Sequence, residues 1–375
     1  MKKLLFLLLV SCTVLLFAKT EIPVMQRAKQ REQIQDTGTT AGNNGAGNQS
    51  GASVLDDPFS ARYVYPGTNI SKNVIPISFG ANDHICSAFR FQRNWILTAA
   101  HCMENAVTST TNQRIYSTVD KQDNGLMRVV FGQPDADHPA NANVYFYKQG
   151  YSSNTNSSSG HSDDIAIIRL EEADTSIEKA QANMTHAVQE MQQAQAQIGQ
   201  LLPAGNPLLA QVEQTDALFQ KEQERLNMKH KVRRDFLNQK LDDYHFFILD
   251  PAQTGELKNR SAVVVRFKEQ RVGSSDRKYP DSYVWKYKGQ RHGADRILGW
   301  FFNQENVATS GSPVIINGFV VSNTSGPNGK NTRETPLYTE QFHQFLVAAM
   351  GAEYPKGLCV QPVSEEMLPA SNPKQ

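Results

Sequence analysis

The stretch Asn94-Trp95-Ile96-Leu97-Thr98-Ala99-Ala100-His101-Cys102 decides the fold. It starts as an apolar strand, from Trp95 to Thr98, and passes through two alanines to a histidine. Small residues beside a histidine leave its ring room to move protons between partners. Because a histidine that works as a general base needs an orienting carboxylate and a nucleophile, the rest of the chain should supply both.

Two further segments supply these groups. Asp164 opens the apolar run Asp164-Ile165-Ala166-Ile167-Ile168-Arg169-Leu170, and Ser310 lies in Ala308-Thr309-Ser310-Gly311-Ser312-Pro313-Val314. In this order the three segments resemble the chymotrypsin-like (trypsin-like) serine peptidase family, over about residues 60–171 and 246–350. Around Ser310 the chain is similar to the bacterial glutamyl-endopeptidase-like branch. The resemblance implies a mainly β fold of two six-stranded antiparallel β-barrels, and a hydrolase with no cofactor and no metal.

The resemblance also assigns roles to residues. His101 is the expected base for Ser310, and Asp164 is the expected orienting acid, because Asp163 would point the opposite way from the start of a strand. The expected oxyanion hole consists of the backbone N–H groups of Ala308 and Ser310, aimed at the charge that develops on the carbonyl oxygen. We therefore expect a serine endopeptidase that forms an acyl-enzyme intermediate.

The chain departs from the family pattern at two positions before the nucleophile. Ala308 stands where relatives have glycine, and its Cβ could disfavour the peptide orientation that an oxyanion hole needs. Thr309 stands where many relatives have an aspartate that pairs with a new N-terminus after activation. The alternative is therefore a catalytically weak or inactive pseudo-peptidase, which would act as a binding module through a helical hairpin.

Substrate-binding residues follow from the same resemblance. We expect the primary pocket near Gln304, and an edge strand that pairs with the substrate backbone; the residues concerned are Gln304, Val321, Ser322, Asn323 and Thr324. No acid stands at position 304 to favour Lys or Arg, so an uncharged side chain of small to medium size is expected. Glu305, one position away, keeps a basic preference open.

The N-terminus has the pattern of a targeting signal. Met1-Lys2-Lys3 is basic and the apolar run continues to Ala18, which predicts a cleaved signal peptide over residues 1–18 and a secreted or periplasmic protein. A lipid anchor on Cys12 is the alternative. Export favours disulfides, and the resemblance pairs Cys86 with Cys102, a bridge that contributes about 3 kcal/mol in the chain-entropy model. Cys359 is left over, as a free surface thiol or an intermolecular bridge.

Composition changes along the chain indicate its organisation. The 375 residues carry a net charge of +1, which gives no sign of a nucleic-acid partner. Residues 19–57 are polar and predict a disordered leader. Short apolar runs then predict one barrel over residues 58–171 and another over residues 246–354, with a closing strand at residues 337–340, a C-terminal helix, and a loose tail over residues 355–375. The strand candidates are Val74–Phe79, Ser87–Phe91, Trp95–Thr98, Met127–Phe131, Val144–Tyr147, Ile165–Leu170, Phe246–Leu249, Val263–Phe267, Tyr283–Tyr287, Ile297–Phe302, Pro313–Ile316 and Phe319–Ser322.

Residues 172–245 have a helical pattern instead. A heptad seam predicts a coiled-coil helix: Ile177, Ala180, Met184, Ala187, Met191, Ala194, Ile198 and Leu201. After a Pro/Gly turn, a looser stripe predicts a second helix, on Val212, Phe219, Leu226, Val232, Phe236 and Leu241. The two should form an antiparallel α-helical hairpin inserted between the barrels, with a solvated basic face at Lys229, His230, Lys231, Arg233 and Arg234. We expect peptide or protein substrates, a protein partner selected by the hairpin, and no membrane span; the alternative is that the hairpin only stabilises the barrels.

Overall fold

The computed structural model describes residues 70–79, 82–121, 125–152, 163–201, 207–249, 257, 261–272, 275–286, 290–291, 297–300, 310–316, 319–328 and 331–360. All of them lie in one compact unit, Ala52–Gln375. The predicted signal peptide and leader lie outside the described residues. Among the described helices, none is both long and apolar enough to span a membrane.

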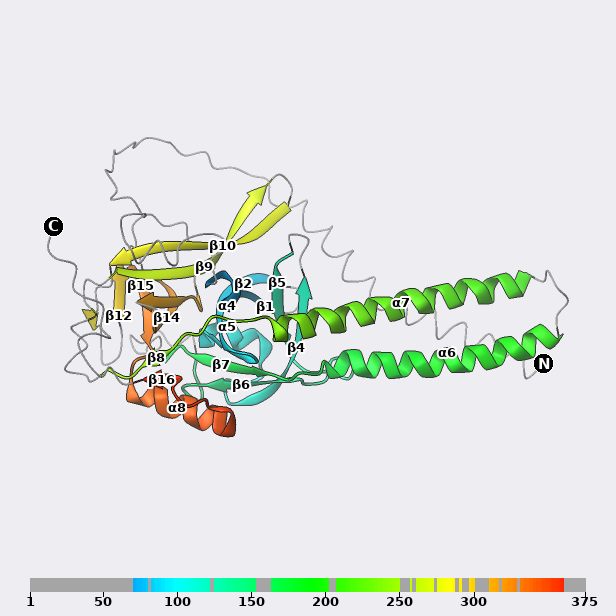
Figure 1. Cartoon of the computed structure of the whole chain (residues 1–375), viewed down its shortest axis with the longest axis horizontal. Coiled ribbons are helices and arrows are strands. Elements are labelled where there is room, and N and C mark those ends of the chain that lie inside the picture. Colours follow the sequence, from blue (N-terminus) through cyan, green and yellow to red (C-terminus); the bar gives the residue numbers. More distant parts are fainter. Residues whose placement is uncertain are drawn as a thin grey trace. The chain divides into compact units, whose positions relative to one another are not determined.

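The first half of the chain forms a closed barrel (Figure 1). Its strands are β1 (Val74–Phe79), β2 (Asn82–Gln92), β3 (Trp95–Thr98), β4 (Gln113–Lys121), β5 (Met127–Gly132), β6 (Ala142–Phe146) and β7 (Ala166–Leu170). They are joined in the order β1-β2-β3-β7-β6-β4-β5, and the parallel pairing of β1 with β5 closes the ring. A helical turn, α4 (Ile70–Asn73), precedes β1.

This barrel has seven strands, whereas six were predicted. All the strands predicted here form, and the additional one is β4. Its inward side chains are Ile115, Ser117 and Val119, each buried, with less buried residues between them. The alternation is regular, but a serine in the middle leaves only two apolar residues on the inner face, so the apolar pattern is weak.

A short helix, α5 (Ala100–Met103), follows β3 directly and continues into a 3-10 turn, η2 (Glu104–Ala106). The predicted disulfide between Cys86 of β2 and Cys102 of α5 is present, with a Cα–Cα distance of 6.2 Å. It joins the start of α5 to the barrel wall, so His101 is carried on a segment that is covalently attached to β2.

The second half forms a sheet with the order β10-β9-β13-β14-β15-β12-β11. Its strands are β9 (Ser261–Val272), β10 (Ser275–Lys286), β11 (Gln290–Arg291), β12 (Ile297–Trp300), β13 (Pro313–Ile316), β14 (Phe319–Asn328) and β15 (Asn331–Pro336). Over the described residues this is an open seven-stranded sheet, whereas a closed six-stranded barrel was predicted. The predicted closing strand at residues 337–340 is wrong, because β15 ends at Pro336.

The C-terminal helix is confirmed as α8 (Glu340–Met350). Thr339 caps it, since its side chain accepts from Phe342 N–H at 3.1 Å. Phe342, Leu346 and Met350 recur every fourth residue and are buried. The 3-10 turn η4 (Gly351–Glu353) follows, and Glu353 accepts from Trp95 Nε1 at 2.9 Å.

The chain stays packed beyond residue 355, where a loose tail was expected to start. β16 (Cys359–Val360) pairs in parallel with β8 (Phe246–Phe247), and Leu358 is buried. Cys359 is a free, half-buried thiol. Burial raises the pKa of Cys359 to about 11, so it is protonated near neutral pH and a poor nucleophile.

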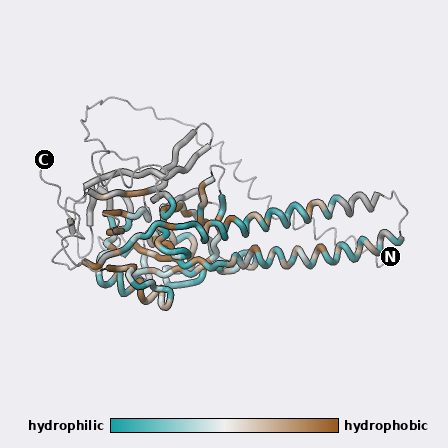
Figure 2. Tube along the Cα trace, in the orientation of Figure 1, coloured by the Kyte–Doolittle hydropathy of each residue, from teal (hydrophilic) through white to brown (hydrophobic). Residues whose placement is uncertain are grey.

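Two long helices, α6 (Thr175–Leu201) and α7 (Pro207–Asn238), lie side by side (Figure 1). The predicted seam of α6 is its less exposed stripe: Ala180, Met184, Ala187, Met191 and Ala194 are all partly buried. Polar and apolar residues alternate along both helices (Figure 2). Burial is greatest near the end of α7, where Leu226, Phe236 and Leu237 are buried.

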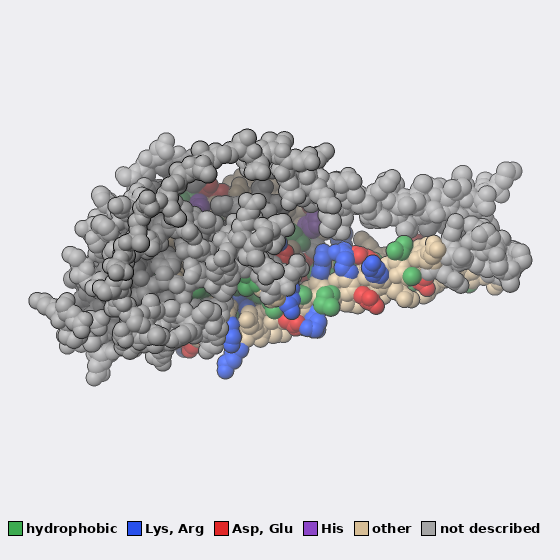
Figure 3. Space-filling model, turned by 90° about the horizontal axis from the view of Figure 1, so that it is seen from above, with side chains coloured by type: hydrophobic (Ala, Val, Ile, Leu, Met, Phe, Trp, Pro, Cys, Tyr) green, Lys and Arg blue, Asp and Glu red, His purple; other side chains and the backbone are tan. Residues whose placement is uncertain are grey.

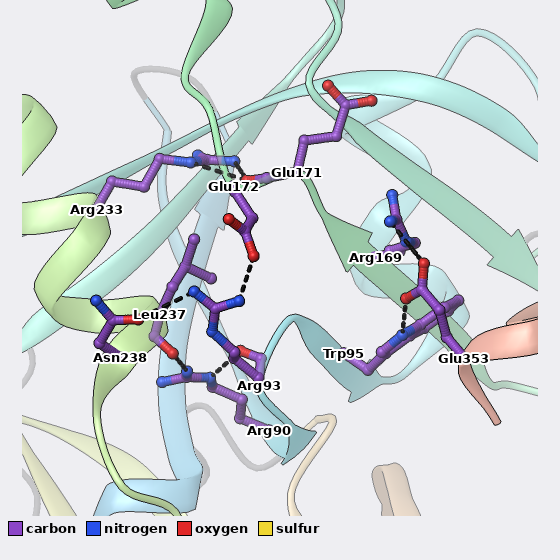
Figure 4. Close-up of polar contacts among 10 residues, drawn as sticks. All are labelled: Arg90, Arg93, Trp95, Arg169, Glu171, Glu172, Arg233, Leu237, Asn238 and Glu353. Atoms are coloured by element: carbon purple, nitrogen blue, oxygen red, sulfur yellow. Dashed lines mark hydrogen bonds and ion pairs between the residues drawn. The ribbon is translucent and has the colours of Figure 1, made fainter. Parts of the chain in front are cut away.

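The end of α7 is fixed to the barrel by two buried arginines (Figure 4). Arg233 donates to Glu171 O at 2.6 Å and to Ser117 O at 3.2 Å. Arg90 of β2 donates to Phe236 O at 2.6 Å and to Leu237 O at 2.9 Å, two carbonyls in the last turn of α7.

The predicted solvated basic face is therefore only partly correct. Arg233 is 1% exposed, whereas Lys229, Lys231 and Arg234 are exposed. Figure 3 shows Lys and Arg side chains gathered on the visible face of the helices. Arg233 differs because its side chain points at the barrel, where the backbone carbonyls of Glu171, Ser117 and Asn141 and the Ser117 hydroxyl accept its hydrogen bonds.

Candidate active site

His101 and Asp164 meet because their two strands are neighbours. β3 pairs with β7, with Thr98 opposite Ala166, and His101 follows β3 while Asp164 precedes β7. His101 N–H donates to Asp164 Oδ1 at 2.8 Å, and His101 Nδ1 lies 2.7 Å from Asp164 Oδ2. One carboxylate thus holds both the backbone and the ring of the histidine.

The surroundings of this pair set its charges. Asp164 is completely buried and also accepts a hydrogen bond from Ser325 Oγ. Burial alone would raise the pKa of Asp164, but the charge of His101 and these hydrogen bonds outweigh burial and lower it. Burial alone would lower the pKa of His101, but Asp164 outweighs burial and raises it. The imidazolium form of His101 is therefore stabilised beside an ionised Asp164.

The ring of His101 is arranged to accept a proton on its outer nitrogen. Since Nδ1 faces Asp164, Nε2 points the other way, and the side chain remains 22% exposed. Asp163 faces Lys148 instead, with Nζ 3.0 Å from Oδ2. The choice of Asp164 over Asp163 as the partner of His101 is thus consistent with the geometry.

Ser310 is held near this pair through its backbone. Ser87 N–H donates to Ser310 O at 2.9 Å, and Gly311 N–H donates to Thr324 O at 2.7 Å. Within the described part of the chain, the Ser310 hydroxyl has no hydrogen-bond partner. Contacts of catalytic groups often tighten only when substrate binds.

Gly311 allows the segment that follows Ser310 to pack closely against the barrel. Its φ is +82°, and a Cβ built there would lie 2.0 Å from Ser87 O and 2.3 Å from Thr98 Oγ1. Any side chain at this position would collide with the barrel strands β2 and β3. A glycine after the nucleophile is therefore required both for the turn and for the packing.

Asn323 connects the two sides of the site. With its amide oriented to suit its neighbours, it donates to Gly311 O at 3.1 Å and accepts from Ala99 N–H at 3.3 Å. Gly311 follows Ser310 and Ala99 is two residues before His101, so one buried side chain spans the gap between them. We predicted substrate contact for Asn323, whereas the structure gives it a positioning contact.

The other predicted substrate residues also lie deeper than expected. Ser322, Asn323 and Thr324 are hydrogen-bonded in the sheet between β13 and β15, so their backbone is not an edge. Val321 is buried in a cluster with Val264, Val314 and Tyr338. Gln304 and Ala308 lie outside the described residues.

Sequence reasoning missed Ser325, the third group on Asp164. It sits where the register of β14 on β15 shifts, between Thr324 and Gly326, and such an irregularity turns a side chain to another direction. No local pattern marks this position, so only the strand pairing reveals it.

In the part of the chain that the structure describes, two groups of possible metal donors are otherwise occupied. Cys86, His101 and Cys102 offer atoms within 4.8 Å of one another, but the two sulfurs are joined in the disulfide and cannot act as thiolates. Asp135 accepts from the backbone N–H groups of Asp137 and His138, as in a capped turn.

Comparison with known proteins agrees with this geometry. Residues 66–207, which include His101 and Asp164, match the family model described as Trypsin. No curated protein matches the chain.

Several solved structures are similar to this chain. HL collagenase is 12% identical and covers 72% of this chain and 88% of its own, with a TM-score of 0.35. A Glu endopeptidase is 13% identical and covers 76% and 92%, with a TM-score of 0.36. AL20, a thermostable serine protease from an extremophilic microorganism, is 11% identical and covers 74% and 97%, with a TM-score of 0.35. The glutamyl-endopeptidase-like branch stays a prediction, whereas the similarity of residues 66–207 to the Trypsin family is shown by the family model.

Proposed function

We propose that this chain is an exported serine endopeptidase in which His101, Asp164 and Ser310 act together. His101 Nε2 takes the proton of the Ser310 hydroxyl as its oxygen attacks the substrate carbonyl carbon. The resulting imidazolium, stabilised by Asp164, gives that proton to the leaving amine as the peptide bond breaks. Water, deprotonated by His101, then hydrolyses the ester and restores Ser310.

The observation that carries this proposal is the two-point contact between Asp164 and His101. A carboxylate without exposure to water is costly unless it is paired, and here its partner is an imidazole that is 22% exposed. The contact holds the proton on Nδ1 and leaves the Nε2 lone pair free, which is the form a general base needs.

The oxyanion would be stabilised by the backbone N–H groups of Ser310 and Ala308. Gly311, with its positive φ, allows the chain to turn directly after Ser310. The substrate backbone would form main-chain hydrogen bonds with the C-terminal end of β14. We also propose residues 172–245 as an insertion between the two sheets that selects protein substrates.

The test combines labelling and turnover of the purified mature chain. A serine-directed phosphonate should label the wild type and the Ser109→Ala control, in which an exposed serine is removed. It should not label Ser310→Ala. Hydrolysis of a short chromogenic peptide should be lost with Ser310→Ala and retained with Ser109→Ala.

Unchanged peptide turnover by Ser310→Ala, or labelling at another residue, would refute the assignment of the nucleophile. If the folded wild type is neither labelled nor active on a peptide library, the protein is a binding module with a peptidase fold. That outcome would indicate that Ala308 and Thr309, the departures from the family pattern, accompany a loss of catalysis.

A further inference from the structure

The last turns of α7 contact the barrel strands that lead to the candidate active site (Figure 4). We call this segment, residues 233–238, the hairpin root. Arg90 of β2 donates to two carbonyl oxygens of the root, at 2.6 Å and 2.9 Å. Arg233 of the root donates to the carbonyl oxygen of Glu171, which directly follows β7, at 2.6 Å. The root therefore contacts both β2 and the end of β7.

The turn between β2 and β3 is tied to the same segment. Arg90 Nε donates to Arg93 O at 2.9 Å, and Arg93 Nη2 donates to Asn238 Oδ1 at 3.0 Å. Leu170 N–H, at the end of β7, donates to Asn94 O in this turn at 2.8 Å. One end of each of the three strands β2, β3 and β7 is thus held at the hairpin root.

The other parts of the same strands hold the candidate active site. β3 leads into His101, and β7 starts two residues after Asp164. On β2, Ser87 donates its N–H to Ser310 O and accepts from Thr98 Oγ1 with its carbonyl, both at 2.9 Å. β3 has four residues, so about 13 Å separates its two ends. Because close-packed interiors transmit strain, a shift of the strands at the root should move the groups at the site.

Burial makes the two arginine contacts well defined. Arg90 is fully buried with its guanidinium 4.2 Å from the centre of the Phe236 ring, and Arg233 is 1% exposed. Burial lowers the pKa of Arg90 to about 10, which leaves it charged near neutral pH. A buried charge has a desolvation cost that well-packed apolar residues would avoid. The planar guanidinium instead fixes the directions of its hydrogen bonds, so these contacts set the orientation of the root on the barrel.

We propose that the hairpin root is a positioning element of the active site, in which Arg90 and Arg233 hold β2, β3 and β7 in the alignment that brings His101 to Ser310. The hairpin then has two parts. Its outer part, residues 182–226, serves the selection of protein substrates, whereas its root serves the chemistry. This inference rests on the proposed function, because alignment affects turnover only at a site that reacts.

The experiment measures kcat and KM separately on a short chromogenic peptide. Arg90→Met keeps the length of the side chain but removes the guanidinium, and kcat should fall about 10- to 100-fold, the range expected for a displacement of up to about 1 Å. KM should change less than twofold, because the substrate contacts remain. Arg90→Lys keeps the charge and can still reach one carbonyl, so it should recover part of kcat.

A matched control separates positioning from a general loss of stability. Leu226 is a buried residue of α7, seven positions before Arg233. Leu226→Ala should destabilise the hairpin but leave kcat of the folded protein unchanged. The same loss of kcat in both variants, or an unchanged kcat in folded Arg90→Met, would overturn the inference while leaving the peptidase assignment intact.

The proton on His101 Nδ1 gives a second readout that does not depend on turnover. Because this proton lies between the ring and a buried carboxylate, it should give a far-downfield NMR signal in the wild type and in Leu226→Ala. In folded Arg90→Met the signal should move upfield or exchange faster. If Arg90→Met does not fold, Arg233→Lys, which keeps the charge but loses the fork, takes its place with the same expectations. If the wild type cleaves no peptide, the proposed function fails, and the NMR signal alone decides whether the root positions His101.

Discussion

Gly311→Ala tests whether the close packing behind the nucleophile is needed for both stability and catalysis. An alanine at φ +82° costs about 1–2 kcal/mol for the left-handed backbone alone. The new Cβ would lie 2.0 Å from Ser87 O and 2.3 Å from Thr98 Oγ1, so strands on both sides must separate by more than 1 Å. Overpacking of this kind costs about 1–3 kcal/mol, which gives about 2–5 kcal/mol in total.

The same movement should impair catalysis. Ser87 N–H holds Ser310 O, and Ser87 O is the atom that the new methyl group displaces. A shift of about 1 Å in a reacting group costs about 100-fold in rate. We therefore expect kcat/KM on a short peptide to fall by about that factor in the fraction of Gly311→Ala protein that folds.

A matched control separates backbone strain from collision. Gly150 also has a positive φ, +71°, but a Cβ there would meet nothing within 4 Å. Gly150→Ala should lose only about 1–2 kcal/mol and keep full activity. The assays are urea unfolding and peptide hydrolysis. If both variants lose the same stability and Gly311→Ala keeps its kcat/KM, the packing argument for Gly311 is wrong.

Three further predictions concern the hairpin and the histidine. Arg233→Ala should lower the free energy of unfolding by about 3–5 kcal/mol, because it removes several charge-assisted hydrogen bonds to buried carbonyls. The exposed Arg234→Ala should change it by less than about 0.5 kcal/mol in denaturant titrations. Residues 182–226 can be replaced by a short Gly/Ser connector, since the retained helix ends already contact each other through Gln181 and Asn227. This variant should still cleave short peptides but should cleave protein substrates more slowly. Loss of peptide cleavage in a folded variant would contradict the prediction. Because Asp164 raises the pKa of His101 above 6.5, kcat/KM should fall as pH decreases through that raised pKa. The residual activity of Asp164→Asn should fall only at lower pH. If the pH profile of kcat/KM is the same in both proteins, Asp164 does not raise the pKa of His101.

The His101–Asp164 contact also makes stability depend on pH. Because the pKa of His101 is raised in the folded state, its contribution to folding stability is complete below about pH 6.5 and is lost as pH rises through the folded pKa. Because the pKa of Asp164 is lowered in the folded state, its contribution to folding stability is present above about pH 3.9 and is lost as pH falls through the folded pKa. The Tm difference between wild type and Asp164→Asn should therefore be largest between about pH 4 and 6.5.

The sequence by itself determined the features that are local along the chain. The strand before His101 and the strand after Asp164 are contiguous apolar runs, so residue types were enough to place both residues at strand ends. The helices α6 and α7 could be predicted because their apolar residues repeat every three or four positions within one segment.

Only the tertiary structure decided which side chains face one another across strands. The register of β14 on β13 and β15 puts Ser325 on Asp164 and places Asn323 between Ala99 and Gly311. A slip of one residue turns every side chain of a strand to the opposite face, and register depends on partners far away in sequence. Arg233 is buried because the barrel presents carbonyls to that one face of α7, which no pattern within the helix reveals.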